Sequence, residues 1–258
     1  MIINPYVFAG PTYDPDAQAY FTANTAITST ADKNAINQYL FVNAKSQGYY
    51  SKITQMILPL WSSAINNKWN LINPLDTNGA YRLTFSTGWT HASSGMTPTN
   101  AYANTFLLAN TFSSNVHVSF YSGTFTAGGS FEMGCSDGST TTLSNRPAVN
   151  SGLGGITPVN YTTTTDARGF WIGSKRSNTD REVYRNGVSQ NTLLTNIPNA
   201  FPNLNIWLGG LNNNNNLSFP SSKQIRFSSI GTGLTDTEAT NYSNNVNALM
   251  TYFGINTY

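Results

Sequence analysis

The chain has 258 residues, of which 39% are hydrophobic and only 9% are charged, and its net charge is +2. A globular protein carries about 25% charged residues on average, so this chain relies on uncharged polar side chains, and Asn and Thr together make up about a quarter of it. The positive charges are scattered and form no basic stripe, which argues against nucleic-acid binding through phosphates, and no apolar run approaches the ~20 residues of a membrane-spanning helix.

The residues that commonly hold metals are scarce. A single cysteine, Cys135, excludes an intrachain disulfide and a cysteine-rich zinc site. Two histidines, His91 and His117, are too few for a histidine-built metal centre, so we expect no cofactor. A calcium site made of loop carbonyls and asparagines stays open. The first residues, 1–6, show no basic region followed by an apolar run, so we expect no secretory signal.

The N-terminal part predicts two helices. Asp14 followed by Pro15 is a helix start, with the acid as N-cap and the proline in the first helical position. A second start lies at Ser29–Thr30, and apolar residues follow it with helical spacing as far as Phe41. Gly48 is placed to end this helix in a left-handed conformation.

From about residue 80 the hydrophobic period changes from 3.6 to 2, which predicts half-buried strands. The apolar positions that define them are Tyr81, Leu83 and Phe85; Val116, Val118 and Phe120; Phe131, Met133 and Cys135; Phe170 and Ile172; Ile206 and Leu208; and Ile225 and Phe227. The residues between them, such as His117, Trp171 and Trp207, are predicted on the opposite, non-core face. Clusters of Gly, Asn, Ser and Pro separate these runs at intervals typical of an antiparallel sandwich.

Three further local patterns lie in the last third of the chain. Asn186–Gly187 predicts a tight hairpin, because both central residues of such a turn must tolerate positive φ. Thr235 and Glu238 form a capping box that starts a C-terminal helix, and Gly254 ends it. The run Asn212–Asn216 is predicted to be a loop between two strands.

The case for catalysis is weak. A glycosidase needs two carboxyl groups facing each other across a cleft. Asp180 and Glu182 are two apart on one strand, and a solvated hairpin flank beside Arg181 explains them more simply. A Ser-His-Asp arrangement forms in space and cannot be read from sequence, but no Gly-x-Ser-x-Gly elbow is present. Cys135 is expected to be a buried, inert thiol. We therefore expect a protein that is not an enzyme.

Binding is better supported, because sugars are recognised by flat aromatic faces together with planar amides and hydroxyls, and the chain is rich in both. The alternative is that helices or a second subunit cover these aromatic rings. The candidate ligand-binding residues are Trp89, His91, Trp171, Trp207, Asn212, Asn213 and Asn214.

Three segments in order resemble laminin-G-like and concanavalin A-like sandwiches. They are the Tyr-x-Asn-Gly hairpin in Glu182–Val188, the strand Ile206–Gly210, and Phe227–Gly231 continuing through Leu234–Glu238. The resemblance implies a concanavalin A-like jelly-roll sandwich with a C-terminal helix. The glucanase branch of that superfamily is marked by Glu-x-Asp-x-Glu on one strand, and this sequence lacks that motif.

A second resemblance covers nearly the whole chain. The segments Tyr13–Ala19, Asn73–Thr77, Gly88–His91, Asp166–Gly169 and Pro202–Ile206 resemble a group of bacteriophage structural proteins that carry a laminin-G-like domain and occur mainly in phages of Bacteroidetes-type hosts. The resemblance implies a virion protein, made in the host cytoplasm and exposed on the particle as a spike, tail fibre or capsid decoration. It supplies no ligand residues.

These lines together predict a mainly β protein in two parts. Residues 1–72 are expected to be a partly helical attachment or packing segment, and residues 73–258 a laminin-G-like sandwich with the C-terminal helix. The expected function is host-surface recognition, with glycans as ligands, by a homo-oligomer that contacts other virion proteins but neither nucleic acid nor membrane. The alternatives are a capsid-decorating or cement protein without a ligand and, less favoured, a glycan-cleaving enzyme.

Overall fold

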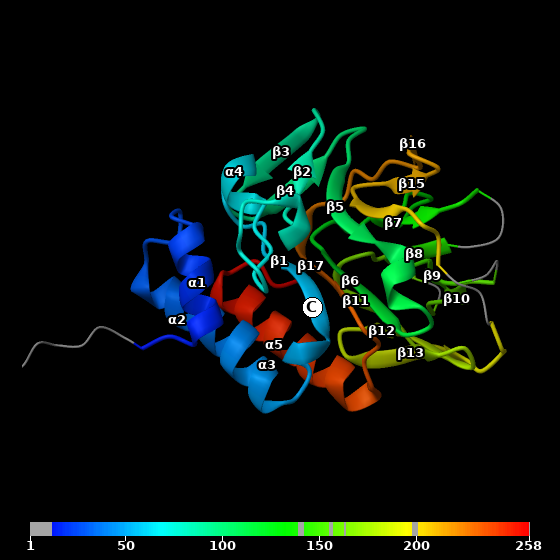
Figure 1. Ribbon diagram of the computed structural model, residues 1–258. Coiled ribbons are helices and arrows are strands. Elements are labelled where there is room, and N and C mark those ends of the chain that lie inside the picture. The colour runs from blue at the N-terminus through cyan, green and yellow to red at the C-terminus, as the bar shows by residue number, and fades with distance from the viewer. Residues whose placement is uncertain (1–11, 139–141, 155–156, 163, 198–200, 258) are drawn as a thin grey trace, which may run out of the picture.

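The computed structural model describes residues 12–138, 142–154, 157–162, 164–197 and 201–257. Two β-sheets face each other, and a layer of helices covers the outer side of one of them (Figure 1). We call the helix-covered sheet A and the other sheet B. The neighbouring strands are antiparallel, apart from one parallel pair in sheet B, so the predicted antiparallel sandwich is confirmed.

The strands of sheet A lie in an order far from their order in the chain. In space the order is β13 (Val188–Leu193), β12 (Asp180–Arg185), β11 (Gly169–Ser177), β6 (Val116–Ser122), β17 (Ile225–Gly231), β4 (Gly95–Pro98) and β3 (Trp89–Ala92), and β1 (Ile53–Ile57) also pairs with β17. β1 lies before the predicted domain boundary at residue 72, so the N-terminal part contributes a strand to this sheet.

Sheet B forms the far side of the sandwich. In space the order is β10 (Val159–Asn160), β9 (Asn150–Leu153), β8 (Thr142–Arg146), β7 (Met133–Ser136), β14 (Asn205–Leu208), β5 (Ala103–Leu108) and β2 (Thr84–Phe85). A hairpin of β15 (Leu211–Asn213) and β16 (Asn216–Ser218) extends it, with β15 parallel to β7.

The helical layer comes from both ends of the chain (Figure 1). Its members are α1 (Pro15–Ala23), α2 (Thr30–Ile36), the π-helical turn η1 (Asn37–Val42), α3 (Asn43–Ser46) and α5 (Asp236–Tyr252). The remaining short helices are α4 (Ala64–Asn67) and the 3₁₀ turns η2 (Tyr50–Lys52), η3 (Asn78–Ala80) and η4 (Ala109–Phe112). No helix of the described residues combines the length and the apolar character that crossing a membrane requires.

The predicted helix ends are confirmed. The Asp14 side chain accepts a hydrogen bond at the start of α1, and Gly48 has φ +83° just after α3. Thr235 and Glu238 form the capping box at the start of α5, and Gly254 follows its end with φ +69°. Each signal satisfies backbone groups that the helix itself leaves unpaired, which explains why short-range sequence sufficed to find them.

The predicted hairpin at Asn186–Gly187 is also confirmed. Asn186 has φ +53° and Gly187 has φ +78°, and they join β12 to β13. The Asn186 side chain accepts a hydrogen bond from the Phe170 amide at 2.8 Å, which ties the turn to the end of β11.

The central strands of sheet A, such as β6 and β11, are buried on both faces, which the predicted half-buried pattern missed. In β6, Val118 and Phe120 belong to the core between the sheets, whereas Tyr121 belongs to a second core between sheet A and the helices. His117 lies on this helix-facing side and is fully buried. The prediction that its side is a non-core face is therefore wrong, because the helical layer covers it.

Two other strand predictions need correction. The strand expected at residues 81–86 is reduced to β2, because Tyr81 adopts a left-handed conformation with φ +60° at the end of η3. Ile225 and Phe227 were expected on one face, but a bulge between them in β17 sends them to opposite cores. An extra residue in a strand reverses which side chains face each side of the sheet beyond it. No local sequence pattern marks the position of this bulge.

Candidate functional site

Two of the predicted ligand-binding residues lie side by side at the β2–β3 end of the sandwich. The rings of Trp89 and His91 have centroids 6.4 Å apart at 25°, and Phe85 packs edge-on against both. Trp89 Nε1 donates to the Tyr102 carbonyl at 3.1 Å, and the Asn67 amide donates to His91 Nδ1 at 2.9 Å. Burial lowers the pKa of His91. These rings are half-buried, and much of their surface packs against one another rather than facing solvent.

The structure gives the other two tryptophans no open ring face. Trp171 is fully buried between the sheets, where its Nε1 donates to the Ala167 carbonyl at 2.9 Å. Trp207 is 6% exposed and stacks on Tyr102 with centroids 3.8 Å apart. Trp171 was predicted to point away from the core, but the core residues used as the reference, Phe170 and Ile172, face the helices instead. Trp171 and Trp207 therefore cannot stack on a sugar in this conformation.

The Asn212–Asn216 run is a hairpin rather than the predicted loop. Asn214 and Asn215 have φ +50° and +65° at its tip. Asn212 is fully buried: its amide donates to the Asn205 carbonyl at 2.7 Å and its Oδ1 accepts from the Asn215 amide. Asn212 is thus a structural residue. Ligand contact by Asn213 and Asn214 stays a prediction.

A pocket lies on the outer face of sheet B, and no sequence pattern had predicted it. In β8, Leu143 packs in the inter-sheet core and Asn145 donates to carbonyls of sheet A, so alternation turns Ser144 outward. Ser144 pairs with Gly134 on one side and Gly152 on the other. Because neither glycine has a side chain, a depression remains over Ser144. A Cβ at Gly152 would fill it, since it would lie 2.7 Å from Ser144 Oγ.

We name this depression the outer-face pocket. It has a volume of about 170 Å³, below the roughly 300 Å³ at which sites for drug-sized ligands begin, so it suits a single small ring or group. The lining residues are Phe131, Thr142, Ser144, Arg146, Asn150, Gly152 and Pro158.

Two polar groups of the outer-face pocket lack the partners they would normally have. Ser144 Oγ is buried and has no hydrogen-bond partner within the described part of the chain. The Arg146 guanidinium lies 4.6 Å over the centre of the Phe131 ring, and its Nε donates a hydrogen bond to the Ser130 carbonyl. Burial lowers the pKa of Arg146, with the Glu132 charge opposing, but an arginine stays protonated in proteins.

The acid nearest to Arg146 is already engaged. Glu132 is fully buried and its Oε1 accepts from Lys223 Nζ at 2.6 Å. Burial raises the pKa of Glu132 and Lys223 opposes that rise. Because one cation already balances Glu132, and no carboxylate of the described chain forms an ion pair with Arg146, the pocket keeps a positive edge.

An exposed aromatic ring lies beside the outer-face pocket. Phe219 is 58% exposed, and its ring centroid is 5.6 Å from that of Phe131. Its backbone has φ +49°, which is uncommon for a bulky residue, and its carbonyl accepts from the Phe131 amide at 3.0 Å. The two rings extend the pocket into an aromatic surface.

A larger pocket lies between the helices and the β3–β4 turn, with a volume of about 550 Å³ and Trp61 and Phe253 in its wall. Three of its polar side chains already have partners. Trp61 Nε1 donates to the Tyr20 hydroxyl at 3.2 Å, Asp32 accepts from the Tyr252 hydroxyl, and Ser94 accepts from Gln224. Among the described residues, none of its lining side chains has a buried polar atom without a hydrogen-bond partner, whereas the outer-face pocket has Ser144 Oγ.

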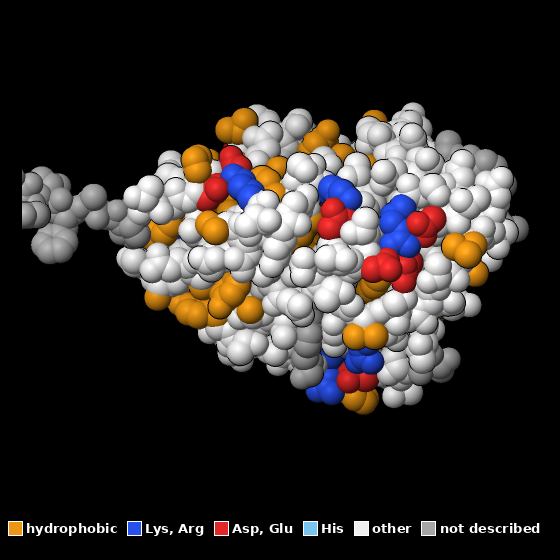
Figure 2. All heavy atoms as spheres, turned by 90° about the horizontal axis from the view of Figure 1, so that it is seen from below, with side chains coloured by type: hydrophobic (Ala, Val, Ile, Leu, Met, Phe, Trp, Pro, Cys, Tyr) orange, Lys and Arg blue, Asp and Glu red, His pale blue; other side chains and the backbone are white. Residues whose placement is uncertain are grey.

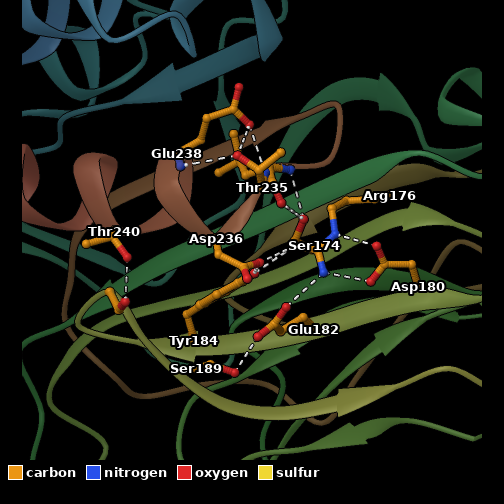
Figure 3. A network of polar contacts seen from close by, with 12 residues as sticks. Ser174, Arg176, Asp180, Glu182, Tyr184, Ser189, Thr235, Asp236, Glu238 and Thr240 are labelled. Atoms are coloured by element: carbon orange, nitrogen blue, oxygen red, sulfur yellow. Dashed lines mark hydrogen bonds and ion pairs between the residues drawn. The ribbon is translucent and has the colours of Figure 1, made fainter.

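The acids weighed for catalysis do not face one another across a cleft. Arg176 binds Asp180, Glu182 and Asp236 together, and so ties β11 and β12 to the start of α5 (Figure 3). On the face drawn in Figure 2, the charged side chains likewise gather in small groups of both signs, separated by uncharged surface.

One serine–histidine contact exists, but it is inaccessible. His117 Nε2 lies 3.0 Å from Ser229 Oγ, and Nδ1 donates to the Thr232 carbonyl at 2.6 Å rather than to a carboxylate. Both residues are buried beneath α5. Cys135 is buried as predicted, which raises the pKa of its thiol to about 12. Within the described ranges, no group of three or more His, Cys, Asp or Glu side chains is arranged to hold a metal ion.

Comparisons with known proteins identify the fold and no family. No family model matches the sequence, and no curated protein matches it. A mutant of the Trypanosoma rangeli sialidase that displays trans-sialidase activity matches over 85% of this chain and 39% of its own, with 9% identity and a TM-score of 0.51. A complex of the same sialidase with a difluoro sugar acid matches over 81% and 34%, with 9% identity and a TM-score of 0.52.

A third solved structure is domain 4 of an extracellular arabinanase from Geobacillus stearothermophilus in complex with arabinotriose. It matches over 74% of this chain and 98% of its own, with 17% identity and a TM-score of 0.44. At these identities the sialidase matches show that the sandwich architecture is shared, and fold alone does not determine function.

Proposed function

We propose that the chain is a carbohydrate-binding protein without catalytic activity, and that it holds its ligand at the outer-face pocket. The observation that carries the proposal is the combination found there: an exposed aromatic ring, a buried hydroxyl without a partner, and a cation without an acidic partner. Contact of a ligand with these groups lowers the free energy, because in the free protein the ring is exposed to water and the two polar groups lack some of their usual partners.

A sugar suits this combination because one side of its ring presents C–H groups and its rim presents hydroxyls. The C–H side would lie on Phe219 and Phe131, where apolar area is removed from water. A ring hydroxyl would reach Ser144 Oγ, and further oxygens would accept from Arg146. Asn150 and Thr142 supply additional polar groups at the edge.

Truncating Phe219 is expected to weaken glycan binding at least about tenfold, since an aromatic anchor in a binding surface typically contributes 2 kcal/mol or more. Arg146→Met is expected to have a similar effect through the loss of a charge-assisted hydrogen bond. A glycan array and a host-polysaccharide binding assay on the wild type identify the ligand, and titration calorimetry of each variant then measures the loss.

Two variants serve as controls for this experiment. Phe125 is 53% exposed and lies under the Arg168 guanidinium, so Phe125→Ala removes a similar ring at another place. Trp61→Ala removes the aromatic wall of the larger pocket. Both are expected to bind as the wild type does. Unchanged binding by Phe219→Ala together with loss in Trp61→Ala would move the site to the larger pocket.

The biological setting of this binding is proposed from the sequence resemblance to phage structural proteins. We propose a virion protein on the particle surface, which contacts other virion proteins and recognises host glycans in several copies. Multiple copies would offset weak binding at a single site. Failure of every oligomeric form to bind any glycan would favour the capsid-decorating alternative.

A further inference from the structure

Two cations face each other in the interior of the sandwich. Lys175 in β11 and Arg181 in β12 are direct cross-strand partners, and both are fully buried. The next residues along the same row are Val116 in β6 and Leu193 in β13, so the row offers no compensating polar side chain. Like charges opposite one another in a sheet destabilise it, and burial in apolar surroundings increases the penalty.

The hydrogen bonds of this pair leave part of it unsatisfied. Lys175 Nζ donates to the Ile197 carbonyl at 3.1 Å and lies 5.2 Å from the Phe201 ring centre. Arg181 donates from Nη1 to the Thr157 carbonyl at 2.9 Å. Its Nε and Nη2 are buried and have no hydrogen-bond partner among the residues that the structure describes. These two nitrogens form one edge of the guanidinium fork, which matches the two oxygens of an oxyanion.

No carboxylate side chain of this protein balances the two charges. The chain has 11 Asp and Glu residues, and all of them lie in the described ranges. Nine of them form ion pairs, and each of these pairs runs to a cation other than Lys175 and Arg181. A buried charge is ordinarily paired, so an anion from outside the chain would supply the counter-charge that this pair lacks. Burial lowers the pKa of Lys175, and the nearby Arg181 charge lowers it further.

We propose that Lys175 and Arg181 form a binding site for a small oxyanion, such as sulfate, phosphate or a carboxylate. The oxyanion accepts from Arg181 Nε and Nη2 and lies against the Lys175 ammonium, and it thereby satisfies the orphaned donors and separates the like charges. This site belongs to the inner face of sheet A, whereas the outer-face pocket lies on sheet B, so the two are independent.

Thermal unfolding at constant ionic strength tests the proposal. Sulfate, phosphate, acetate and chloride are compared, first with the wild type and then with Arg181→Met. We expect the melting temperature of the wild type to rise with saturation in sulfate or phosphate, by about 5–10 °C at a concentration of about 100 Kd. A saturating rise with acetate alone would assign the site to a carboxylate. If chloride raised the melting temperature as much as every oxyanion does, the proposal of an oxyanion site would be overturned.

The variants separate binding from the general stabilising effect of sulfate, which is excluded from protein surfaces. In Arg181→Met we expect only a non-saturating rise. Arg226→Met is the matched control, because it removes one positive charge from an arginine that also lacks an acidic partner among the described residues and bonds to the Ile255 carbonyl and Gln224. It should keep the saturating response.

Titration calorimetry of the wild type with sulfate and with acetate gives a readout that needs no folded variant. A saturable heat with one site per chain is expected for the oxyanion that stabilises the protein. Absence of saturable heat for both ions, or equal salt responses in the wild type, Arg181→Met and Lys175→Met, would overturn the proposal.

Discussion

Replacing Trp171 by alanine is expected to lower the free energy of unfolding by about 4 kcal/mol, because truncation of a buried aromatic side chain leaves a cavity that the surroundings fill only in part. The ring is fully buried, stands edge-on to Tyr161 with centroids 4.8 Å apart, and carries the Arg185 guanidinium at 4.7 Å. The variant also leaves the Ala167 carbonyl without its donor. Urea unfolding, monitored by far-ultraviolet circular dichroism rather than by tryptophan fluorescence, measures the change in the free energy of unfolding.

Two comparison variants show whether the burial of the Trp171 ring causes the loss of stability. Trp171→Phe keeps most of the apolar volume and should lose clearly less stability than Trp171→Ala. Trp89→Ala removes a half-buried ring and should also lose less. If Trp171→Ala were as stable as the wild type while glycan binding fell, the ring would be a ligand contact, and its placement between the sheets would be wrong.

Acidification from pH 7 to pH 4 is expected to remove about 3 kcal/mol of stability through His117 alone. Burial lowers the pKa of His117 to about 4, with the Thr232 carbonyl opposing and the Lys52 charge assisting. The unfolded chain therefore binds this proton near pH 6.5, while the folded protein does not. The contribution is fully present above pH 6.5 and is lost as the pH falls toward 4.

The His117→Gln variant isolates this effect from the other groups that titrate in acid. A glutamine can still donate to the Thr232 carbonyl and accept from the Ser229 hydroxyl, but it does not titrate. The difference in unfolding free energy between the two proteins, measured in urea from pH 7 to pH 4, should change by about 3 kcal/mol. Parallel pH curves would show that His117 is protonated in the folded state or exposed.

Local signals in the sequence were sufficient for the features that depend on a few adjacent residues. The Asp14 cap, the Asn186–Gly187 turn and the capping box at Thr235 and Glu238 were all predicted where the structure has them. The sandwich class also followed, because alternation with a period of 2 is a property of each strand on its own. The division at residue 72 stays a prediction, although β1 joins sheet A across it.

Features that depend on which elements cover a face could not be predicted. The helices hide the outer side of sheet A, so apolar residues occur on both sides of β11, and alternation did not reveal that Trp171 faces the other sheet. The outer-face pocket depends on the register that aligns Gly134, Ser144 and Gly152 across three strands. These residues are dispersed in the sequence and carry no local pattern that would join them.

Nuclear magnetic resonance can locate a glycan bound at the outer-face pocket residue by residue. The isotope-labelled protein is titrated with the best-binding glycan from the array, and backbone amide shifts are followed. We expect saturating shifts centred on Gly134, Ser144 and Gly152, with Phe219 at the edge of the affected surface. Saturating shifts centred on Trp61 and Phe253, or on Trp89 and His91, with none at Ser144, would contradict binding at the outer-face pocket.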